Sequence, residues 1–481
     1  MPDDHDVLFI GGEWVRPSSA ARIGVRSAST GEPVGSAPEA TEADVDAAVA
    51  AARRAFDDPS GWSQWEPGRR AAVLERLAAE LEARGPEIGR LVSLQNGMPI
   101  ALSPLIEGMT PVGTLRYAVS LLAGAPVEEQ VPRFLGGNLI IRHEPVGVVG
   151  AIVPWNYPQT LASFKYAPAL AAGCTIVIKP SPETVLDSYV FAEAVLAAQI
   201  PPGVISIVPG GRELGAYLVQ HASVDKIAFT GSTAAGRQIA EVCGRLLRPV
   251  SLELGGKSAA IVLDDADLDL AKIGQDLFAA TLVNNGQTCY AGTRILAPRS
   301  RYDEVVDTFA AFASSLRVGD ALDPDTMIGP LVSQRQRDRV ERYIAKGSSD
   351  GARLVTGGGR PSGLDHGWFV EPTVFADVDN SSTIAQEEIF GPVLSVIGYT
   401  DTDDAIRIAN DSDYGLGGSV WTSDPERARD VVRRVRTGTR GINSYLPDPA
   451  GPWGGVKCSG IGRELGPGAV AGYQQLKTVY L

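Results

Sequence analysis

The stretch VGVVGAIVPWNYP, residues 146–158, sets the fold class of this chain. Residues 146–153 are all apolar or glycine, which is typical of a strand buried on both faces. Pro154-Trp155-Asn156 then ends the strand, and a helix is expected over 158–172. A buried strand that leads into a helix is the first half of a parallel strand–helix–strand unit.

The same alternation continues after residue 172. Strands are expected over 175–179, 204–208 and 226–229, each followed by a helix. Ligands of such a doubly wound sheet lie beyond the carboxyl ends of its strands. We therefore expect four groups at one edge: Pro154-Trp155-Asn156, Lys179, Gly210-Gly211 and Thr230-Gly231-Ser232.

A second α/β unit is expected after Glu253. Its strands are predicted over 370–378, 393–398 and 418–421. The fold class is therefore α/β, with two doubly wound domains.

The chain before residue 146 is predicted to be mostly helical. A hairpin is expected over 7–16, and helices over 41–56 and 67–84, with a third helix beginning at Pro86. Residues 124–142 are expected to be extended, either as a ribbon for subunit contact or as a surface hairpin. A terminal strand over 476–481 is expected to pair with another strand edge.

Composition bounds the function. The chain has 481 residues, 44% of them hydrophobic and 21% charged, which fits two or three globular domains. A formal net charge of −14 argues against nucleic acid or an anionic membrane as a partner. The acidic N-terminus does not resemble a signal peptide, and the apolar runs are too short to span a bilayer.

The cysteines and histidines are few and scattered. Such spacing argues against a disulfide framework and against a metal site, and it fits a reducing cytoplasm. The four cysteines are Cys174, Cys243, Cys289 and Cys458.

Cys289 is the candidate nucleophile. It follows a Gly286-Gln287-Thr288 turn after a mostly apolar run, a position that would present the thiol beside backbone N–H groups. A lone cysteine is more often a small buried hydrophobic residue, so its neighbours in the fold must support the assignment.

Two features suggest a nucleotide site. Thr230-Gly231-Ser232 joins a strand to a helix, and the helix N-terminus offers free N–H groups to a phosphate. Lys179 ends another strand and is placed to contact a ribose or a phosphate; the alternative is a lysine whose head reaches to solvent.

Glu253 and Asn156 complete the set. Glu253 lies between leucines, so desolvation would raise its pKa toward that of a general base; alternatively it pairs with Lys257 or Arg248. The amide of Asn156 could donate to an oxyanion, or it could cap the helix that follows. Together with Cys289, these residues suit covalent catalysis on a carbonyl with removal of a hydride.

Seven motifs, in order along the chain, resemble those of the aldehyde dehydrogenase superfamily, of the NAD(P)-dependent, non-acylating type. The resemblance covers nearly the whole length. The motifs are Pro154-Trp155-Asn156-Tyr157-Pro158, Lys179-Pro180-Ser181, Phe229-Thr230-Gly231-Ser232, Leu252-Glu253-Leu254-Gly255-Gly256-Lys257, Gly286-Gln287-Thr288-Cys289, Glu387-Glu388-Ile389-Phe390-Gly391-Pro392 and Gly460-Ile461-Gly462-Arg463-Glu464-Leu465-Gly466.

The resemblance implies roles. Cys289 would attack the aldehyde carbon, with the Asn156 side chain and the Cys289 N–H as the oxyanion hole. Glu253 would activate the water that hydrolyses the thioester. Glu388 would bond the nicotinamide ribose, and Phe390 would pack beside the ring. The residues expected on the cofactor side are Trp155, Lys179, Glu183, Gly211, Gly231, Ser232, Leu254, Glu388 and Phe390.

One departure bears on the cofactor. Many NAD-using members carry a glutamate three positions after the lysine, where this chain has Pro182, and Glu183 comes one position later. NAD is the predicted cofactor, and the sequence leaves NADP open.

The resemblance also implies a substrate tunnel lined by aromatic side chains. Such a tunnel suits an apolar or aromatic aldehyde, or a cationic one held by cation–π contact. Pro452-Trp453-Gly454-Gly455 resembles the betaine and amino-aldehyde members. The tunnel positions are Met109, Tyr157, Phe164, Tyr290, Tyr445 and Trp453.

The family's architecture implies a domain division. A Rossmann-like nucleotide-binding domain would comprise residues 1–123 and 146–252, and a catalytic domain residues 253–455. Residues 124–145 and 467–481 would form a small bridging β element used in a homodimer or homotetramer.

Two other functions fit the sequence less well. A CoA-acylating aldehyde dehydrogenase commonly lacks the base, so Glu253 argues against it. A catalytically silent binding protein is disfavoured because Cys289, Glu253 and Asn156 occur together.

Overall fold

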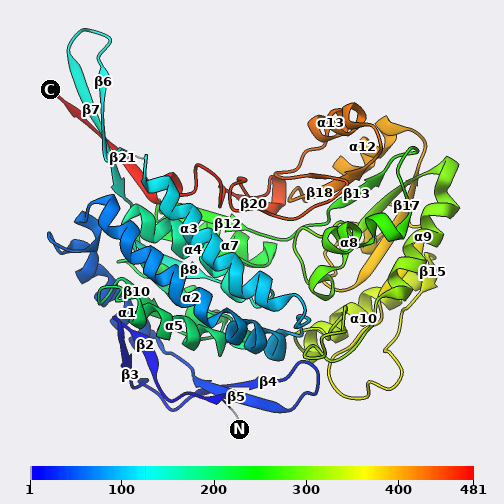
Figure 1. Ribbon diagram of the computed structural model, residues 1–481, viewed down its shortest axis with the longest axis horizontal. Helices are drawn as coiled ribbons and strands as arrows, with labels where there is room; N and C mark the ends of the chain where they lie inside the picture. Colours follow the sequence, from blue (N-terminus) through cyan, green and yellow to red (C-terminus); the bar gives the residue numbers. More distant parts are fainter. Residues whose placement is uncertain (1–2, 125) are drawn as a thin grey trace.

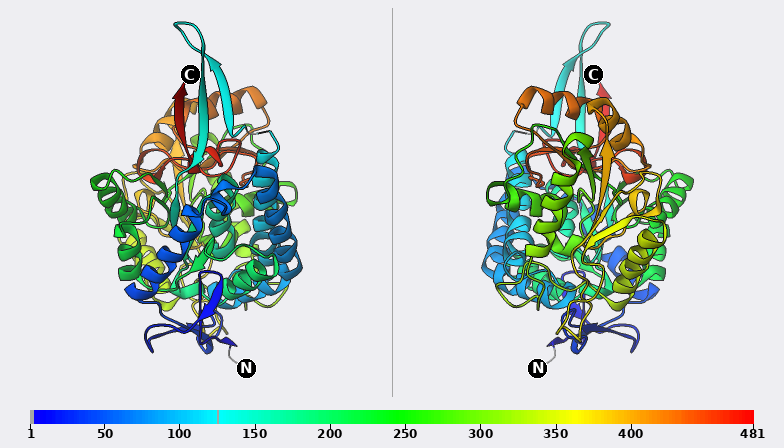
Figure 2. Two further views of the ribbon diagram at one scale, coloured as in Figure 1. Left: turned by 90° about the vertical axis from the view of Figure 1, so that its left-hand side faces the viewer. Right: turned by 90° about the vertical axis from the view of Figure 1, so that its right-hand side faces the viewer.

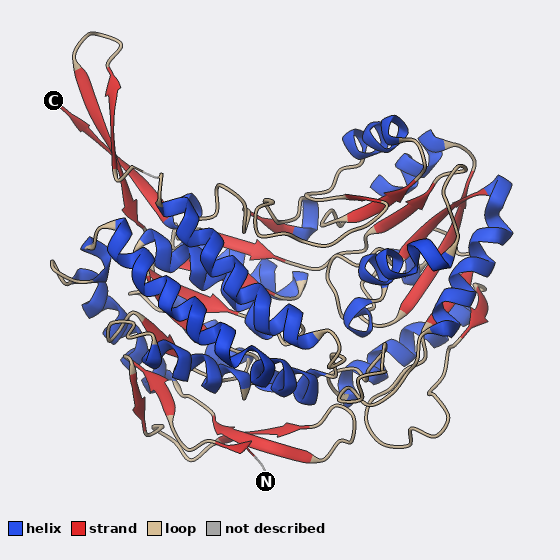
Figure 3. Ribbon diagram, in the orientation of Figure 1, coloured by secondary structure: helices blue, strands red, loops and turns tan. Residues whose placement is uncertain are grey.

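The computed structural model describes residues 3–124 and 126–481. Two open sheets, each flanked by helices, lie side by side, and a ribbon of strands projects from the first (Figure 1 and Figure 3). The predicted α/β class with two doubly wound sheets is confirmed. Within the described ranges, no helix has both the length and the apolar character needed to cross a bilayer.

The first sheet holds the predicted strand–helix alternation. Its strands are β2 (Leu8–Ile10), β3 (Glu13–Val15), β8 (Val148–Ile152), β9 (Thr175–Lys179), β10 (Ile205–Ile207), β11 (Lys226–Thr230), β12 (Val250–Glu253) and β20 (Gly460–Ile461). They lie in the order β20-β12-β11-β8-β9-β10-β2-β3, and the strands from β12 to β10 are parallel. The chain runs outward from β8 to β10 and then returns to β11 beside β8. In sheets of this kind a ligand is expected at such a reversal, here beyond the ends of β8 and β11.

Helices cover both faces of this sheet. They are α1 (Glu42–Asp57), α2 (Pro67–Asn96), α3 (Thr110–Leu122), α4 (Pro158–Ala172), α5 (Asp187–Ala197), α6 (Arg212–Gln220) and α7 (Thr233–Arg245). Every residue of α4 is buried, which suits its apolar sequence. The one charged side chain of α4, Lys165, is therefore buried as well and needs a partner.

The predicted break at Pro86 is wrong. Pro86 lies inside α2, which runs unbroken to Asn96 and ends at Gly97, a residue in the left-handed conformation with φ 84°. An interior proline removes one backbone hydrogen bond. Packing of α2 against α3, α4 and α5 outweighs that loss.

The second sheet follows Glu253. Its strands are β13 (Ala259–Val262), β14 (Arg294–Pro298), β15 (Arg353–Thr356), β16 (Thr373–Ala376), β17 (Val393–Tyr399), β18 (Gly418–Trp421) and β19 (Gly441–Ile442). Their order is β15-β16-β17-β14-β13-β18-β19, with only β15 antiparallel to its neighbour among these described strands. The strand predicted over 370–378 is shorter and corresponds to β16. The helices are α8 (Leu270–Thr281), α9 (Tyr302–Ser315), α10 (Gln334–Ser349), α11 (Thr383–Gln386), α12 (Thr402–Asn410) and α13 (Pro425–Arg434).

A three-stranded antiparallel ribbon stands off the body, as Figure 2 shows from two sides. It consists of β6 (Glu128–Pro132), β7 (Asn138–Pro145) and β21 (Gln474–Tyr480), with β7 in the middle. The predicted pairing of the terminal strand is confirmed, since β21 pairs with β7 from Gln474 to Tyr480. A further small sheet near the N-terminus contains β1 (Asp3–Asp4), β4 (Arg22–Arg26) and β5 (Pro33–Pro38).

Candidate active site

The carboxyl ends of four parallel strands meet at one edge of the first sheet. Ile152 pairs with Lys179 and with Phe229, and Thr230 pairs with Glu253. The ends of β8, β9 and β11 therefore come together, as predicted, and Lys179 also bonds to the predicted Gly210 after β10. Glu253, at the end of β12, lies at the same edge.

Three consecutive residues in left-handed conformation turn the chain toward Cys289. Asn284, Asn285 and Gly286 have φ values of 52°, 60° and 72°, in the short helical turn η4 (Val283–Gly286). Asparagine tolerates this region better than most residues. Only glycine fits at position 286, because a Cβ there would lie 2.3 Å from the Gly391 oxygen.

Cys289 lies directly against the segment that carries Glu253. A Cβ on Gly256 would be 2.3 Å from the Cys289 oxygen, so the glycine permits this approach. The Cys289 residue is partly exposed. Burial, followed by the charges of Glu388 and Glu253, raises the pKa of its thiol above the ordinary value.

Asn156 is held beside the cysteine turn. Its Nδ2 donates to the Gln287 oxygen at 3.0 Å, and its own backbone oxygen accepts from Asn96 and Asn284 at 3.1 and 2.9 Å. The cap position of α4 is occupied by Tyr157, and the Asn156 side chain bonds to Gln287 instead, so the capping alternative for Asn156 is wrong. One N–H of the Asn156 amide remains for a ligand.

Glu253 is buried, with 2% of its surface exposed. Within the described part of the chain, neither carboxylate oxygen has a hydrogen-bond partner, and the Lys257 ammonium has none either. Arg248 is occupied elsewhere and donates to the His221 oxygen at 2.8 Å. Burial, and then the charge of Glu464, raises the pKa of Glu253 well above its ordinary value.

A buried ion pair beside Glu253 escaped the sequence analysis. Lys165 of α4 lies 2.9 Å from Glu464, with both side chains almost fully buried, and also donates to Thr230 Oγ1 at 2.6 Å. The backbones of Glu464 and Trp453 donate a hydrogen bond to each other, which fixes the loop that carries Glu464. A lysine in an otherwise apolar helix was the available signal in the sequence.

Lys179 is 5% exposed and does not reach solvent. Its Nζ donates to the Pro180 and Gly210 oxygens at 2.9 and 2.7 Å, which leaves a third donor for a ligand. Burial lowers its pKa to about 8.

The strand-to-helix turns at this edge place glycines where side chains would collide. A Cβ on Gly231 would lie 2.5 Å from the Phe229 ring, and Leu254 packs closely on Gly236 of α7. Ser232 caps α7, and Gly211 is the cap residue of α6. Both helices thus begin at this edge of the sheet, where their N-termini can face a phosphate.

Glu183 faces a helix of the second unit. Its carboxylate accepts from Ser181 Oγ at 2.6 Å and pairs with the exposed Arg335 of α10 at 3.1 Å. The pair joins the loop after β9 to the start of α10.

Glu388 and Phe390 approach from the second unit. Glu388 Oε1 accepts from the Gly256 N–H at 3.0 Å, and burial raises its pKa to about 7. Phe390 has a φ of 63°, unusual for an aromatic residue, and its ring is edge-on to Trp155 at 5.3 Å. Glu388 thus contacts the backbone of the Glu253 segment, and Phe390 contacts Trp155, the residue before Asn156.

Most of the predicted tunnel residues share one apolar cluster. Tyr290 meets Tyr445 and Trp453 edge-on, with ring centres 5.0 and 5.6 Å apart, and Tyr157 is hydrogen-bonded to Thr288 at 2.6 Å. Met109 is 37% exposed and lies outside this set of buried side chains. Tyr157, Phe164, Tyr290, Tyr445 and Trp453 all belong to the main hydrophobic core, and Cys289 packs against that core.

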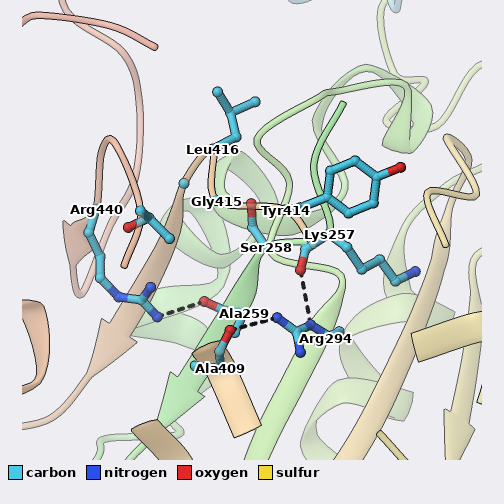
Figure 4. Close-up of a pocket in the computed structure, with 11 residues that line it drawn as sticks. Lys257, Ser258, Ala259, Arg294, Ala409, Tyr414, Gly415, Leu416 and Arg440 are labelled. Carbon is cyan, nitrogen blue, oxygen red and sulfur yellow. Dashed lines mark hydrogen bonds between the residues drawn. The ribbon is translucent and has the colours of Figure 1, made fainter. Parts of the chain in front are cut away.

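A separate small cavity lies behind the Glu253 segment (Figure 4). Arg294 donates to the Lys257 oxygen at 2.9 Å, and Arg440 donates to the Ala259 oxygen at 3.1 Å. The cavity has room for about one water and none of the candidate catalytic side chains lines it. Its arginines anchor the backbone that follows Glu253.

Comparisons with known proteins show the family of this chain. The model of the aldehyde dehydrogenase family matches residues 14–479. A geranial dehydrogenase from Castellaniella defragrans is 56% identical over the whole of both chains.

Solved structures also match over nearly the whole chain. An aldehyde dehydrogenase from Mycobacterium tuberculosis, complexed with NAD⁺, is 50% identical, with a TM-score of 0.97 over 100% of this chain and 99% of that one. A mutant aldehyde dehydrogenase C from Pseudomonas syringae, complexed with NAD⁺ and octanal, is 39% identical, with a TM-score of 0.94 over 98% and 96%. This chain belongs to the aldehyde dehydrogenase family.

Proposed function

We propose that this enzyme oxidises an apolar aldehyde and that Cys289, Asn156 and Glu253 carry out the chemistry. The reaction class follows from the family: an NAD-dependent oxidation of a small aldehyde to its carboxylic acid. The roles of these three residues are supported by two contacts with the cysteine turn. Asn156 bonds to Gln287, and Gly256, in the Glu253 segment, lies against Cys289.

In the first step the Cys289 thiolate attacks the carbonyl carbon. A C–S bond forms, and the electron pair of the C=O bond moves to oxygen. The free N–H of Asn156 and the backbone N–H of Cys289 donate to that oxygen and stabilise its charge. The thiol must lose its proton first, and its raised pKa makes this a demanding step.

The residues present fit NAD. Lys179 has a spare donor, α7 begins with free N–H groups at Ser232, and the Glu388 carboxylate faces the glycines that precede Lys257. When bound, NAD supplies the acceptor for the hydride that the carbon loses as the thiohemiacetal becomes a thioester. The remaining cofactor contacts, from Trp155, Glu183, Gly211, Gly231, Leu254 and Phe390, are proposed on the same basis.

Glu253 completes the reaction. Its carboxylate takes a proton from a water, whose oxygen bonds to the thioester carbon, and the C–S bond breaks to return Cys289. Burial and Glu464 raise the pKa of Glu253, so its unprotonated form is a strong base in a dry site. Hydrolysis of this kind needs no CoA, and Glu253 therefore argues against the acylating alternative.

An apolar substrate is favoured by the character of the cluster around Cys289. Tyr157, Phe164, Tyr290, Tyr445 and Trp453 are buried with apolar neighbours. The relative named for geranial and the structure solved with octanal involve apolar aldehydes, whereas the betaine aldehyde dehydrogenase from Staphylococcus aureus is 34% identical. Cation–π binding of a charged aldehyde is the second candidate, on the strength of Trp453.

The remaining assignments are also proposals. The domain division stays as predicted: 1–123 with 146–252, 253–455, and 124–145 with 467–481. The exposed ribbon supports a homodimer or homotetramer. The free thiols Cys174, Cys243, Cys289 and Cys458 support a cytoplasmic location.

The test is NADH absorbance with geranial, octanal and betaine aldehyde, with and without CoA, together with chromatography of the acid. We expect acid without CoA, kcat/KM highest for the apolar aldehydes, and no turnover in Cys289→Ala. No acid without CoA, or undiminished turnover in Cys289→Ala, would refute the mechanism. A preference for betaine aldehyde would refute the apolar substrate alone.

A further inference from the structure

The helix that follows Asn156 has no cap of its own. Tyr157 occupies the cap position of α4 but its side chain makes no capping bond, and Pro158 has no N–H to offer. The first free donors are the N–H groups of Gln159 and Thr160. Both donate to one oxygen of Glu107, at 2.8 and 3.3 Å. A distant carboxyl group therefore supplies the missing cap.

Glu107 reaches α4 from a tightly held turn. It lies in η2 (Pro104–Met109), a π-helical turn, and is fully buried. The turn is pressed onto α2, because a Cβ on Gly108 would be 2.7 Å from the Gly85 oxygen. Thr160 Oγ1 donates to the Ile106 oxygen at 2.5 Å, which ties the same turn to α4 a second time. The cap is thus anchored to the body of the protein.

A second layer of bonds surrounds the same segment. The Gln159 side chain donates to Asp187 at 2.6 Å, and Gln95 donates to the other oxygen of Asp187 at 2.9 Å. Next to Gln95, Asn96 donates to the backbone oxygens of Trp155 and Asn156, both at 3.1 Å. The backbone around Asn156 is therefore fixed from one side by α2 and from the other by the capped end of α4.

We propose that Glu107 is a positioning residue for the oxyanion hole: its carboxyl group fixes the first turn of α4 and thereby holds Asn156 and Tyr157 against the cysteine turn. This inference rests on the proposed function, because it acts through the role assigned to Asn156. Glu107 accepts from two backbone N–H groups in the first turn of α4, so it acts on Asn156 through the helix. Errors of about 1 Å in the position of a catalytic group can cost about 100-fold in rate.

A conservative variant separates the capping role from the charge. Burial raises the pKa of Glu107 to about 8, so the group carries a proton at neutral pH. Its second oxygen, Oε1, is buried and has no hydrogen-bond partner in the described part of the chain. Glu107→Gln keeps an acceptor for both N–H groups and resembles the protonated acid in shape. Glu107→Leu removes the acceptor while filling a similar volume.

The experiment is a double-mutant cycle read by single-turnover hydride transfer. Glu107→Leu and Glu107→Gln are made in the wild-type and Asn156→Ala enzymes, and NADH absorbance is followed in stopped flow with octanal at saturating NAD. We expect Glu107→Leu to slow hydride transfer about 10- to 100-fold in the wild-type enzyme. In Asn156→Ala it should cost no more than about twofold, because both substitutions act on the same interaction. Glu107→Gln should stay within about twofold of wild type.

Controls keep the test decisive. Leu218→Ala, at a buried position of α6, should lower the Tm without slowing hydride transfer beyond about twofold. If Glu107→Leu does not fold, Glu107→Asp replaces it, because the shorter side chain withdraws from α4 and should give a smaller loss that again vanishes in Asn156→Ala.

The role of Glu107 would be refuted if Glu107→Leu slowed hydride transfer equally in the wild-type and Asn156→Ala enzymes. It would also be refuted if Glu107→Gln slowed hydride transfer as much as Glu107→Leu; neither result would affect the proposed function. Unchanged hydride transfer in Asn156→Ala would instead overturn the oxyanion role in the proposed function.

Discussion

The thiol of Cys289 shares its surroundings with two carboxyl groups. Burial is the first cause of its raised pKa, and the charges of Glu388 and Glu253 add to it. In the protein without cofactor, thiolate should therefore be scarce at neutral pH and increase as the solution becomes alkaline. A positively charged nicotinamide ring beside the sulfur would act in the opposite direction.

Replacing Glu388 tests this electrostatic account. Glu388→Gln removes a negative charge, so the pKa of Cys289 should fall and alkylation by iodoacetamide should become several-fold faster. The gain should appear mainly above about pH 7, because burial raises the pKa of Glu388 to about 7 and the group is neutral below it. Mass spectrometry of the labelled peptide measures the rate, with Cys289→Ala as the blank. Slower labelling in Glu388→Gln would contradict the account.

Glu253 should matter after hydride transfer and not before it. Glu253→Gln keeps the shape of the buried side chain but cannot take a proton from water. We expect a burst of about one NADH per active site, followed by turnover slower by about 100-fold or more. Rapid-mixing absorbance measures the burst, and mass spectrometry of quenched enzyme detects the acyl group. Normal steady-state turnover in Glu253→Gln would show that another group activates the water.

The sequence allowed one part of this site to be foreseen and not another. Asn156 follows a predicted strand and Lys179 ends another, and the ends of parallel strands must meet. No strand was predicted before Glu253, which was singled out because leucines flank it. Lys165 and Glu464 form their bond across 299 positions of the chain, and no local pattern reveals such a partner. The cap from Glu107 to α4 was missed for the same reason, since each residue looks ordinary in its own segment.

The buried helix α4 carries a charge that must be balanced. Lys165→Met leaves Glu464 buried without its partner and should lower the free energy of unfolding by about 3–5 kcal/mol. The double variant Lys165→Met/Glu464→Leu removes both charges and should recover most of that loss. Urea unfolding followed by circular dichroism gives both values. Strictly additive losses would mean that the two side chains stabilise the fold independently.

The cap on α4 should also make stability depend on pH. Burial raises the pKa of Glu107 to about 8 and that of Asp187 to about 6. Between the ordinary carboxyl range and these values, the folded protein keeps protons that the unfolded chain has lost. The free energy of unfolding should therefore fall as the pH rises from about 4 to about 8.

Glu107→Gln isolates one contributor to this effect. The variant has no group to titrate at position 107, so its stability relative to wild type should increase across the same pH window, by on the order of a few kcal/mol. Thermal or urea unfolding at a series of pH values measures the difference. A difference that shrinks as the pH rises would show that Glu107 is charged in the folded protein.

Element boundaries followed the sequence where local chemistry fixes them. The helix predicted over 41–56 is α1, with Thr41 at its cap position and the Thr41 N–H donating to Asp44 at 2.8 Å. The helix break predicted at Pro86 was wrong because an interior proline destabilises the helix only locally. The packing that keeps α2 continuous comes from α3, α4 and α5, which the local sequence does not show. For residues 124–142, the sequence did not distinguish a ribbon for subunit contact from a surface hairpin. The strands β6 and β7 have little core of their own, and β7 also pairs with β21 near the distant C-terminus.

In the projecting ribbon, one edge of β21 is not paired with any strand in the described part of the chain. In the ribbon, β21 pairs with β7 on one side only, and Leu476 and Tyr480 are 66% and 72% exposed. Phe134 and Leu135 at the ribbon's tip are 102% and 86% exposed. An open strand edge with large apolar side chains invites pairing with another chain, and a second copy of this protein is the partner that we propose.

Two charges on this edge should therefore separate the subunits. We expect Leu476→Asp/Tyr480→Asp to raise the dissociation constant of the oligomer at least about tenfold, because each aspartate would have to be desolvated at the contact. Light scattering coupled to size-exclusion chromatography measures the mass over a dilution series. Leu322→Asp, at an exposed site on the second unit, is the matched control and should leave the mass unchanged. Since Cys289 and its neighbours come from the body of one chain, separated subunits should still show the NADH burst. An unchanged mass in the double variant would mean that the ribbon edge is not the subunit contact.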